Sequence, residues 1–374
     1  MRFTVSSNAL SSKLVTLSKV INSKNSVAIL ADFLFEVKEG RLHLTASDSE
    51  VVMRAIVDLT DSDSDGRFCI SSQNLLNAVK GIPEQPITFQ INDNDNILVV
   101  NYQNGHFSLP IENADEYPSS QRPGDDATEI TIPNSLLAEN INRSVFATAQ
   151  DEIRLVMNGI YFDMTPEWLA IVATDGHKLV RNRILTIHTD NPKSFILPKK
   201  PATLLKSVLG KDGGDAVIRF DERTAEIIYA DGDITCRLIE GRYPNYNSVI
   251  PQNNINHVTA DRQCLLAALK RVQPFSDVVS DLIRFHVENG TLQLDAQDFN
   301  YSKTASERMA CDYNGMPLSI GFKGSSFIEI LSNFDCQDII VQLADSTRAG
   351  LVVPSEQPEG QDVLMLMMPM LLSE

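Results

Sequence analysis

The sequence is poor in the residues that mark a disulfide scaffold, a metal centre or a membrane segment. It has 5 cysteines in 374 residues, and they are odd in number, widely spaced and without a Cys-x-x-Cys pair. This pattern predicts buried thiols in a reducing compartment at Cys69, Cys236, Cys264, Cys311 and Cys336. The histidines lack metal-ligand spacing, so we expect no metal and no cofactor. No basic and then apolar leader opens the chain, and its longest apolar run, 363–372, is about half a membrane span. We therefore expect a cytoplasmic protein with no membrane partner.

The motifs of common enzymes are also missing. There is no P-loop and no Gly-x-Gly-x-x-Gly, so nothing indicates nucleotide hydrolysis or dinucleotide binding. The run Asp61-x-Asp63-x-Asp65-Gly66 begins like a calcium loop, but Ser72 stands where the bidentate Glu is required. His177 lies close to Asp175 without a nucleophile elbow. We expect no catalytic residue; the alternative is an enzyme with its site at a domain junction, which would require titratable clusters near 126 and 254.

What the sequence does contain is a threefold internal repeat with a period near 125 residues. The segments 33–55, 160–183 and 283–306 each show an alternating strand, a turn, a second strand that ends Ala-x-Asp, and a third strand. The equivalent aspartates are Asp48, Asp175 and Asp298. A period of this length matches a folding unit with its own core and not a solenoid repeat. The repeat predicts three domains, at 1–126, 127–254 and 255–374.

Each repeat has two segments with the apolar spacing of a surface helix, and the remainder is typical of short strands. Ser71, Pro198 and Asp261 are expected helix starts, and Gly81 and Gly210 expected helix ends. The fold class that follows is α+β, with two helices packed on antiparallel sheet in each of three tandem repeats.

Charge is distributed unevenly along the chain. The net charge is −17, which by itself argues against nucleic-acid binding. Four windows, however, contain no Asp or Glu and hold 14 of the 32 Lys and Arg residues: 1–31, 66–83, 191–211 and 262–276. Each window coincides with an expected helix. If these helices line a closed ring, the ring would hold duplex DNA by attraction to phosphates without reading bases. The alternative is an ordinary solvated face of mixed charge.

Three motifs resemble one protein family. They are Ala173-Thr174-Asp175-Gly176-His177-Lys178-Leu179, Glu240-Gly241-Arg242-Tyr243-Pro244-Asn245-Tyr246 and the terminal Met368-Pro369-Met370. Together they resemble the bacterial DNA polymerase III beta subunit, the sliding clamp, and the resemblance spans all three repeats. It implies a non-catalytic head-to-tail homodimer that forms a ring around double-stranded DNA. The implied partners are the replicative polymerase, the clamp loader and other proteins that carry a clamp-binding peptide.

The resemblance also implies three sets of site residues. A peptide pocket between the second and third domains would use Met157, Thr174, Gly176, His177, Lys178, Leu179, Pro244, Ser248, Val249, Met368, Pro369, Met370 and Leu371. The DNA-binding positions would be Lys24, Gln150, Arg154, Lys199, Lys200 and, from the helix argument, Lys206. The dimer interface would involve Phe107, Leu109, Pro274 and Phe275.

The sequence departs from the usual family pattern at a few pocket positions. Ser248 replaces an Arg, Ser326 lies near the position of a Tyr, and the chain ends Leu371-Leu372-Ser373-Glu374 where Arg-Leu is usual. The chief alternative to a ring is a monomeric three-domain scaffold that binds peptides without encircling anything.

Overall fold

The computed structural model describes residues 1–22, 25, 27–92, 96–210 and 213–372. The chain forms two compact units, the first made of 1–138 and 200–238 and the second of 139–199 and 239–374. The expected domain boundaries at 126/127 and 254/255 remain predictions. No helix in the described ranges is both long enough and apolar enough to cross a membrane.

The same order of elements occurs three times, which confirms the α+β class and the threefold repeat. Each repeat runs strand, helix, four strands, helix, three strands. Repeat one comprises β1 (Arg2–Ser6), α1 (Ser7–Ser18), β2 (Asp32–Lys38), β3 (Arg41–Ser47), β4 (Val51–Asp58), β6 (Gly66–Ser71), α2 (Ser72–Val79), β7 (Pro86–Asn92), β8 (Ile97–Tyr102) and β9 (Gly105–Glu112), with a short extra β5 (Asp61–Ser62). Repeat two comprises β10 (Thr128–Pro133), α3 (Asn134–Val145), β11 (Gly159–Met164), β12 (Leu169–Thr174), β13 (Lys178–Ile184), β14 (Lys193–Pro198), α4 (Lys199–Val208), β15 (Asp215–Phe220), β16 (Thr224–Tyr229) and β17 (Gly232–Arg237). Repeat three comprises β18 (Asn256–Asp261), α5 (Arg262–Val272), β19 (Leu282–Glu288), β20 (Thr291–Asp298), β21 (Lys303–Ala310), β22 (Leu318–Lys323), α6 (Gly324–Ser332), β23 (Asp338–Leu343), β24 (Gly350–Pro354) and β25 (Gln361–Met367).

Short 3-10 helices occur in the connections between these elements. They are η1 (Ala28–Ala31), η2 (Ala114–Glu116), η3 (Leu155–Asn158), η4 (Tyr246–Val249) and η5 (Gln273–Phe275).

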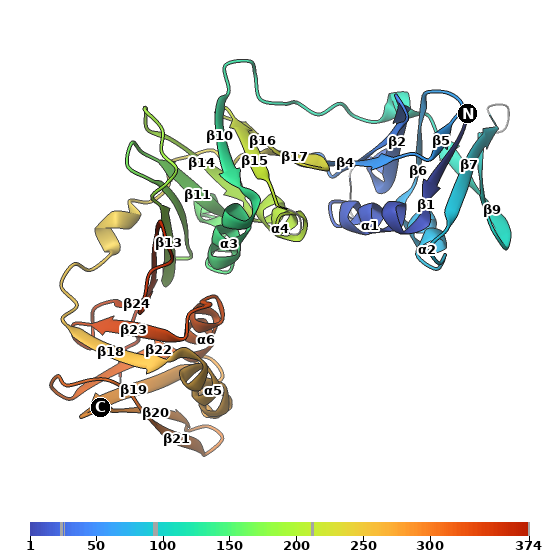
Figure 1. Ribbon diagram of the computed structural model, residues 1–374. Coiled ribbons are helices and arrows are strands. Elements are labelled where there is room, and N and C mark those ends of the chain that lie inside the picture. Colours follow the sequence, from blue (N-terminus) through green and yellow to red (C-terminus); the bar gives the residue numbers. More distant parts are fainter. Residues whose placement is uncertain (23–24, 26, 93–95, 211–212, 373–374) are drawn as a thin grey trace. The chain divides into compact units, whose positions relative to one another are not determined.

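In the first unit a single sheet joins strands of repeats one and two. Its order is β10-β15-β16-β17-β4-β3-β2-β6-β9-β8-β7-β1-β5. The junction between the repeats is the antiparallel pair β17 and β4, which runs from Gly232 opposite Ala55 to Cys236 opposite Val51. Helices α1 and α2 contact each other and lie on one side of this sheet (Figure 1). A strand from one repeat therefore closes the sheet edge of its neighbour.

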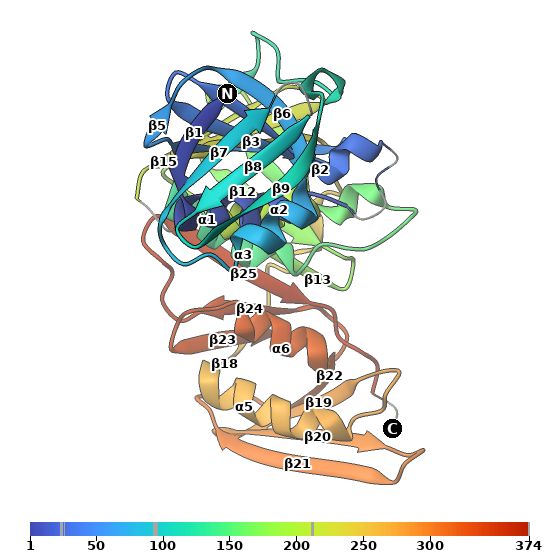
Figure 2. The ribbon, with the colours of Figure 1, turned by 90° about the vertical axis from the view of Figure 1, so that its right-hand side faces the viewer.

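The second unit contains the same kind of strand pairing between two repeats. Its larger sheet has the order β14-β11-β12-β13-β25-β24-β23-β18, so that β13 of repeat two pairs with β25 of repeat three. The pairing runs from Lys178 opposite Met367 to Ile184 opposite Gln361. A smaller sheet, β21-β20-β19-β22, carries α5 and α6 side by side (Figure 2).

Helix starts follow the sequence signals. The Ser71 hydroxyl accepts a hydrogen bond from Asn74 N at 3.5 Å, and the Asp261 carboxylate accepts from Cys264 N at 2.7 Å. These bonds satisfy amide groups that have no partner within the helix. Helix α4 starts directly after Pro198, and Gly210, just beyond its end, has φ +86°, as a helix-terminating glycine requires. The expected starts at Ser71, Pro198 and Asp261 are confirmed.

The core of each repeat lies between helices and sheet and is rich in phenylalanine. The rings of Phe3 and Phe89 stack at 4.8 Å in repeat one, and those of Phe162 and Phe195 at 4.6 Å in repeat two. In repeat three Phe285 packs against Phe327 at 4.8 Å. Along β2 and β19 buried residues alternate with more exposed ones, because successive side chains point to opposite faces.

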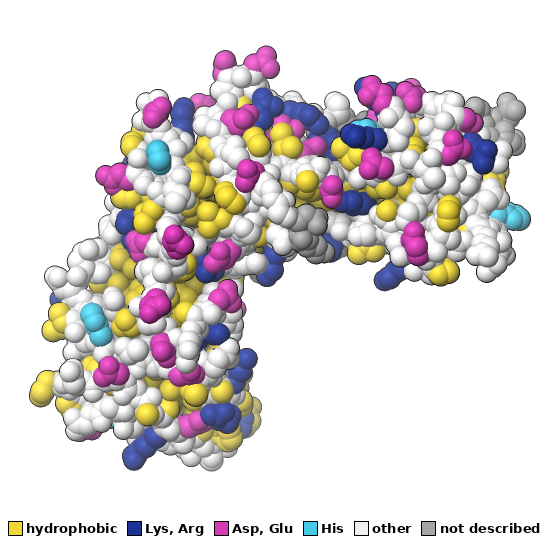
Figure 3. Space-filling model, in the orientation of Figure 1, with side chains coloured by type: hydrophobic (Ala, Val, Ile, Leu, Met, Phe, Trp, Pro, Cys, Tyr) yellow, Lys and Arg dark blue, Asp and Glu magenta, His cyan; other side chains and the backbone are white. Residues whose placement is uncertain are grey.

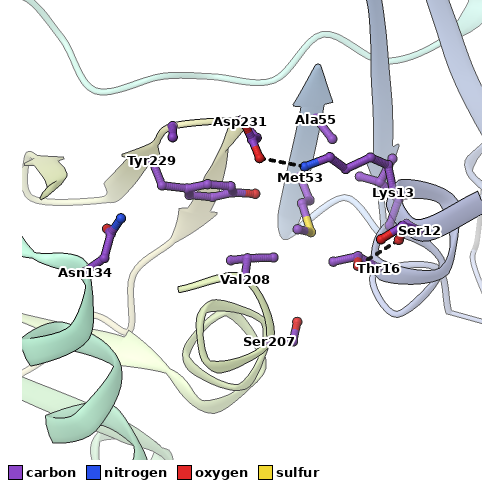
Figure 4. A pocket seen from close by; sticks show the side chains of 12 residues that line it. Ser12, Lys13, Thr16, Met53, Ala55, Asn134, Ser207, Val208, Tyr229 and Asp231 are labelled. Atoms are coloured by element: carbon purple, nitrogen blue, oxygen red, sulfur yellow. Dashed lines mark hydrogen bonds and ion pairs between the residues drawn. The ribbon is translucent and has the colours of Figure 1, made fainter. Parts of the chain in front are cut away.

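On the helix side, the β4 and β17 junction encloses a small cavity of about 160 Å³ (Figure 4). Lys13 of α1 forms an ion pair with Asp231, in the turn between β16 and β17, at 2.9 Å. Met53, Val208 and Tyr229 also line the cavity. Lys13 comes from an acid-free window, and its charge is used to fasten one repeat to the next.

One expectation about the cysteines is wrong. Cys69 and Cys236 are buried and Cys311 and Cys336 are half-buried, but Cys264 is exposed. Cys264 lies in the first turn of α5, on the face turned away from the core. Leu265 and Leu269 of the same helix are fully buried in the core. All five thiols are free.

We predict that Leu294→Ala lowers the free energy of unfolding by about 2–5 kcal/mol, because Leu294 is fully buried in the core of repeat three and the truncation leaves a cavity. Urea unfolding followed by circular dichroism measures the effect. Val278→Ala is the matched control, since Val278 is 76% exposed and should change stability by less than about 0.5 kcal/mol. Equal effects of the two substitutions would contradict this assignment of the core.

Candidate functional site

The repeated aspartate builds the turn at the centre of the candidate site. Asp175 follows β12, and its Oδ1 accepts hydrogen bonds from His177 N at 2.8 Å and Lys178 N at 2.9 Å. Thr174 is buried; its hydroxyl donates to Lys178 O at 2.8 Å and accepts from Gly176 N at 3.1 Å. Gly176 has φ +91°, which favours glycine. The turn 174–178 is thus fixed by its own side chains.

The other two repeats use their aspartates in the same way. Asp48 Oδ1 accepts from Glu50 N and Val51 N, and Asp298 Oδ1 accepts from Asn300 N and Tyr301 N. The conserved element of the repeat is therefore a side-chain-supported turn after the second strand. Its surroundings differ from repeat to repeat, and in repeat two His177 of the turn accepts a hydrogen bond from Met368 of the C-terminal segment.

Segments distant in sequence meet at the 174–178 turn. A Cβ placed on Gly176 would lie 3.1 Å from a guanidinium nitrogen of Arg154 and 3.7 Å from the methyl of Met157, so these side chains cover the turn from one side. On the other side His177 O accepts a hydrogen bond from Met368 N at 2.8 Å. The structure therefore brings Met157, Gly176, His177 and Met368 together, while their role in binding a peptide stays a prediction.

The C-terminal segment runs on from β25 across the second unit. Leu366 lies opposite Leu179, and both are buried. After Met368, Met370 N donates to Gly321 O of β22 at 2.8 Å, so the segment continues as a bridge to the smaller sheet. Met368 is 41% exposed and Leu371 is 85% exposed. Backbone hydrogen bonds hold the segment and leave these side chains available to a ligand.

The connection 239–255 forms a further side of the candidate site, in addition to the residues around Gly176 and the C-terminal segment. Tyr243 is buried and stacks on Tyr161 with ring centroids 4.6 Å apart. The hydroxyl group of Tyr246 donates a hydrogen bond to Asp163 at 2.7 Å. Both tyrosines belong to the buried cluster that includes Leu179 and Leu366. Burial raises the pKa of both phenols, so they stay neutral. Between and after these anchors Pro244, Ser248 and Val249 are exposed.

Lys178 differs from a free ligand-binding lysine. Its side chain is buried, and its ammonium group contacts Glu329 of α6 at 2.8 Å and Asp175 at 3.4 Å. It also lies 5.7 Å from the ring centroid of Phe146. Its position fits a role in joining repeat two to α6 of repeat three better than direct contact with a ligand.

The residues expected to bind DNA fall into different settings. Lys24 lies outside the described residues. The ammonium group of Lys200 donates to Val20 O and Asp48, which fastens repeat two to the turn of repeat one. Gln150 is exposed, and Lys206 is exposed near the end of α4, while Lys199 begins that helix and is half-buried. The assignment of these residues to DNA stays a prediction.

Arg154 belongs with the peptide residues by position. Its Nε donates to Asp151 at 2.9 Å, and its guanidinium borders Gly176 and Met157. Hydrogen bonds from the backbone N–H groups of Arg154 and Ile153 hold the pKa of Asp151 below its usual range, so this carboxylate is ionised at neutral pH. Sequence reasoning placed Arg154 only in the DNA set.

Other residues of the site carried no clear sequence signal. Tyr243 and Leu366 form its floor, and Gly321 receives the C-terminal segment. The motif around 240–246 contained Tyr243, but its stacking on Tyr161 depends on pairing between strands. Across the described residues no group of three or more His, Cys, Asp or Glu side chains could hold a metal.

The residues expected at a dimer interface are partly or fully exposed. Phe107 and Leu109 alternate with exposed residues along β9. Pro274 and Phe275 lie in η5 directly after α5, and Phe275 is 41% exposed.

Comparison with known proteins agrees with this geometry. Three family models match consecutive parts of the chain: the DNA polymerase III beta subunit N-terminal domain at residues 1–121, the central domain at 131–245 and the C-terminal domain at 247–370. The chain is 27% identical to the beta sliding clamp of Pseudomonas aeruginosa and 28% identical to that of Escherichia coli K12, over the whole of each chain. A crystal structure of the Pseudomonas aeruginosa clamp bound to griselimycin superposes with a TM-score of 0.93 at 27% identity, with full coverage of both chains.

The fold and the site together define a DNA clamp made of three repeats in one chain. The chain belongs to the DNA polymerase III beta subunit family. It is a sliding clamp of DNA replication, and the family is a non-catalytic processivity factor.

We predict that Asp175→Ala loosens the 174–178 turn, because two backbone N–H groups lose their acceptor, at a cost of about 1–3 kcal/mol in local stability. Amide hydrogen exchange at His177 and Lys178 should accelerate. Asp190→Ala provides the control, since Asp190 is exposed on the loop before β14. Unchanged exchange at His177 would show that the turn is held by other means.

Proposed function

We propose that two copies of this chain form a closed ring around double-stranded DNA, and that partner proteins bind through short peptides at the 174–178 turn. The observation that carries the ring is the pairing of strand edges. Repeat one closes on repeat two through β4 and β17, and repeat two closes on repeat three through β13 and β25. The equivalent strand of repeat three is β21, which is the edge of its sheet.

Repeat one supplies the complementary edge. Strand β9 is the equivalent of β17 and β25, and over 105–110 it pairs only with β8 among the described residues. An edge with unpaired N–H and C=O groups invites pairing with another chain. A head-to-tail dimer in which β21 of one copy pairs with β9 of the next would satisfy both edges and close the ring.

The internal repeat also predicts the register of this pairing. Cross-strand neighbours in repeat two run Ile130, Ile218, Ile227, Ile234 and then Met53 of the adjoining repeat. In repeat three they run Val258, Val341, Val352, Met365 and then Val180. In repeat one they run Phe3, Phe89, Val100 and Phe107, with no further strand. Met53 lies opposite Ala46, and Val180 lies opposite Ala173, the alanines of the repeated Ala-x-Asp motif. In repeat three the alanine of this motif is Ala296, and the residue opposite it is Ala305. Phe107 should therefore face Ala305 of the second copy.

The exposure of these residues supports the proposal. Ile234 and Met365 are fully buried at their junctions, whereas Phe107 is only half-buried. Pairing with β21 would cover Phe107 and Leu109, and Pro274 and Phe275 lie in η5, which contacts β21. Burial of these apolar groups would stabilise the dimer.

The DNA-binding surface rests on the helices. Lys199 and Lys206 on α4 and Lys24 and Gln150 elsewhere would attract phosphates without reading sequence. Acidic side chains are dispersed over the face of both units seen in Figure 3, so no single acidic patch opposes this arrangement there. The cytoplasm is the compartment where this activity is expected.

The peptide site combines exposed apolar side chains with a fixed backbone. Met368 and Met370, together with the buried Met157 beside Gly176, suit a site that must adapt to several partners, because thioether side chains repack readily. The related clamp of Pseudomonas aeruginosa has been crystallised with bound griselimycin. We expect the replicative polymerase and the clamp loader to use this site in the present chain. Ser248 leaves one side open where other clamps carry Arg, so its peptide preference should differ from theirs.

Substitution of Met370 and Leu371 by Ala should weaken the binding of a clamp-binding peptide by more than about 1 kcal/mol, since apolar anchors contribute most of the energy at such interfaces. Fluorescence anisotropy with a labelled polymerase peptide measures this. Met316→Ala is the control, because Met316 is 81% exposed in the connection between β21 and β22. Equal affinities of the wild type and the double variant would remove the C-terminal segment from the site.

Light scattering tests the ring. The wild type should have about twice the chain mass of 41.4 kDa, and Phe107→Asp should shift it toward a single chain, because a carboxylate would be buried at the strand pairing. Val15→Asp serves as the control at an exposed helix position, where Val15 is 38% exposed. A wild-type mass of one chain at micromolar concentration would favour the monomeric scaffold instead.

A further inference from the structure

The aspartate turn of repeat three is longer and more apolar than the turns of the other repeats. Between the repeated alanine and the residue opposite it, the chain runs through 47–52 in repeat one, 174–179 in repeat two and 297–304 in repeat three. The repeat-three segment is therefore longer by two residues, 8 against 6. It contains Phe299 and Tyr301, which are 80% and 68% exposed. Two neighbouring exposed aromatic side chains indicate a surface that another surface covers. We call residues 298–302 the aromatic turn.

At both internal junctions the corresponding turn contacts the last strand of the neighbouring repeat. Glu50 O accepts a hydrogen bond from Arg237 N at 3.0 Å at the end of the β4 and β17 pairing. His177 O accepts a hydrogen bond from Met368 N at 2.8 Å at the end of the β13 and β25 pairing. The turn of one repeat therefore lies against the end of the last strand of the next repeat.

The internal repeat identifies the surface that the aromatic turn would meet in the proposed ring. Arg237 follows Ile234 by three residues, and Pro110 follows Phe107, which corresponds to Ile234, by the same number. Ile97 lies opposite Pro110 on the neighbouring strand β8. Pro110 is exposed, and Ile97 is 39% exposed. Repeat one thus carries an exposed apolar surface at the position where the internal junctions place the turn.

A junction between copies cannot form the backbone hydrogen bond of the internal junctions. Ser302 corresponds to Glu50 and His177, and the residue expected opposite its carbonyl group is Pro110. Proline has no backbone N–H, so Pro110 cannot donate to this carbonyl. Removal of apolar surface from water is the interaction that aromatic, proline and isoleucine side chains can supply instead.

A cavity beside the aromatic turn fits the same arrangement. Its volume is about 470 Å³, and its lining, which includes Phe299 and Leu372, comes from repeat three alone. The corresponding cavity at the β4 and β17 junction has a volume of about 430 Å³ and is lined both by the turn 47–50 and by strands β16 and β17 of the next repeat. By this correspondence, β8 and β9 of a second copy would complete the lining of the repeat-three cavity.

We propose that the aromatic turn of each copy packs on Ile97 and Pro110 of the second copy. This contact rests on the proposed ring, to which it adds a region outside the pairing of β9 with β21, the edge strand of the smaller sheet (Figure 2). Phe299 and Tyr301 become covered by the second copy, and Ile97 and Pro110 become covered with them. A second copy is the partner that fits, because β9 corresponds to the strands that occupy this place at both internal junctions.

Dissociation constants of the dimer, measured by analytical ultracentrifugation with fluorescence detection, test this contact. The double variant Phe299→Ala with Tyr301→Ala should raise the dissociation constant by at least about tenfold, because aromatic anchors contribute much of the energy at interfaces. Ile97→Ala should raise it by about threefold or more. Met316→Ala is the matched control, since Met316 is 81% exposed in the connection between β21 and β22 and should leave the dissociation constant unchanged.

Combination of the variants separates a direct contact from an indirect effect. If the aromatic turn packs on Ile97, the triple variant should weaken the dimer by clearly less than the product of the separate effects, because the same interaction is lost only once. Effects that multiply, or a double variant that dimerises like the wild type, would overturn the contact and leave the ring in place. A wild-type protein with the mass of a single chain would overturn both. Circular dichroism checks that each variant is folded.

Discussion

The structure depends on the closure of strand edges between repeats. A strand at the edge of a sheet leaves a row of unpaired N–H and C=O groups, and pairing with another strand satisfies them. Within the chain this occurs twice, at β4 with β17 and at β13 with β25. At each junction, the strand of one repeat supplies hydrogen-bond partners for the unpaired N–H and C=O groups of the neighbouring repeat. The chain has three repeats and two such junctions, and the proposed association with a second copy rests on the edge strand β21 and on the 105–110 part of β9.

Charged pairs mark the two internal junctions. Arg54 of β4 reaches Asp233 of β17 at 2.6 Å, and the equivalent Arg181 of β13 reaches Asp362 of β25 at 2.6 Å. Burial lowers the pKa of Arg181, and the nearby Asp362 raises it again, so the ion pair offsets part of the desolvation cost. Such a pair would be left unsatisfied by a slip in register, which favours a single alignment. The equivalent position on β21 is Ser306, so a junction between copies would lack this pair.

The aspartate turn of each repeat serves different purposes in different repeats. The aspartate turn is the same in all three repeats, yet Asp48 also holds Lys200 of the next repeat, while Asp175 supports a turn that meets Arg154, Met157 and Met368. Because the aspartate side chain of the turn binds the backbone N–H groups of the turn, the turn keeps its shape when different residues surround it. The candidate peptide site is thus a specialised version of a structural element that the other repeats keep for packing.

The sequence alone determined the threefold repeat, the α+β class and the helix starts, because periodicity, side-chain caps and turn residues act within a few positions of the chain. It also predicted that the Thr174 to Leu179 motif and the Met368 to Met370 ending belong to one peptide site; the structure places His177 next to Met368, and the assignment to peptide binding stays a prediction. Only the tertiary structure decided that Lys178 and Lys200 are used in ion pairs between repeats, that Arg154 covers Gly176, and that Cys264 is exposed. These outcomes depend on which strands and helices become neighbours across more than a hundred residues, and the spacing of residues along the chain does not encode those contacts.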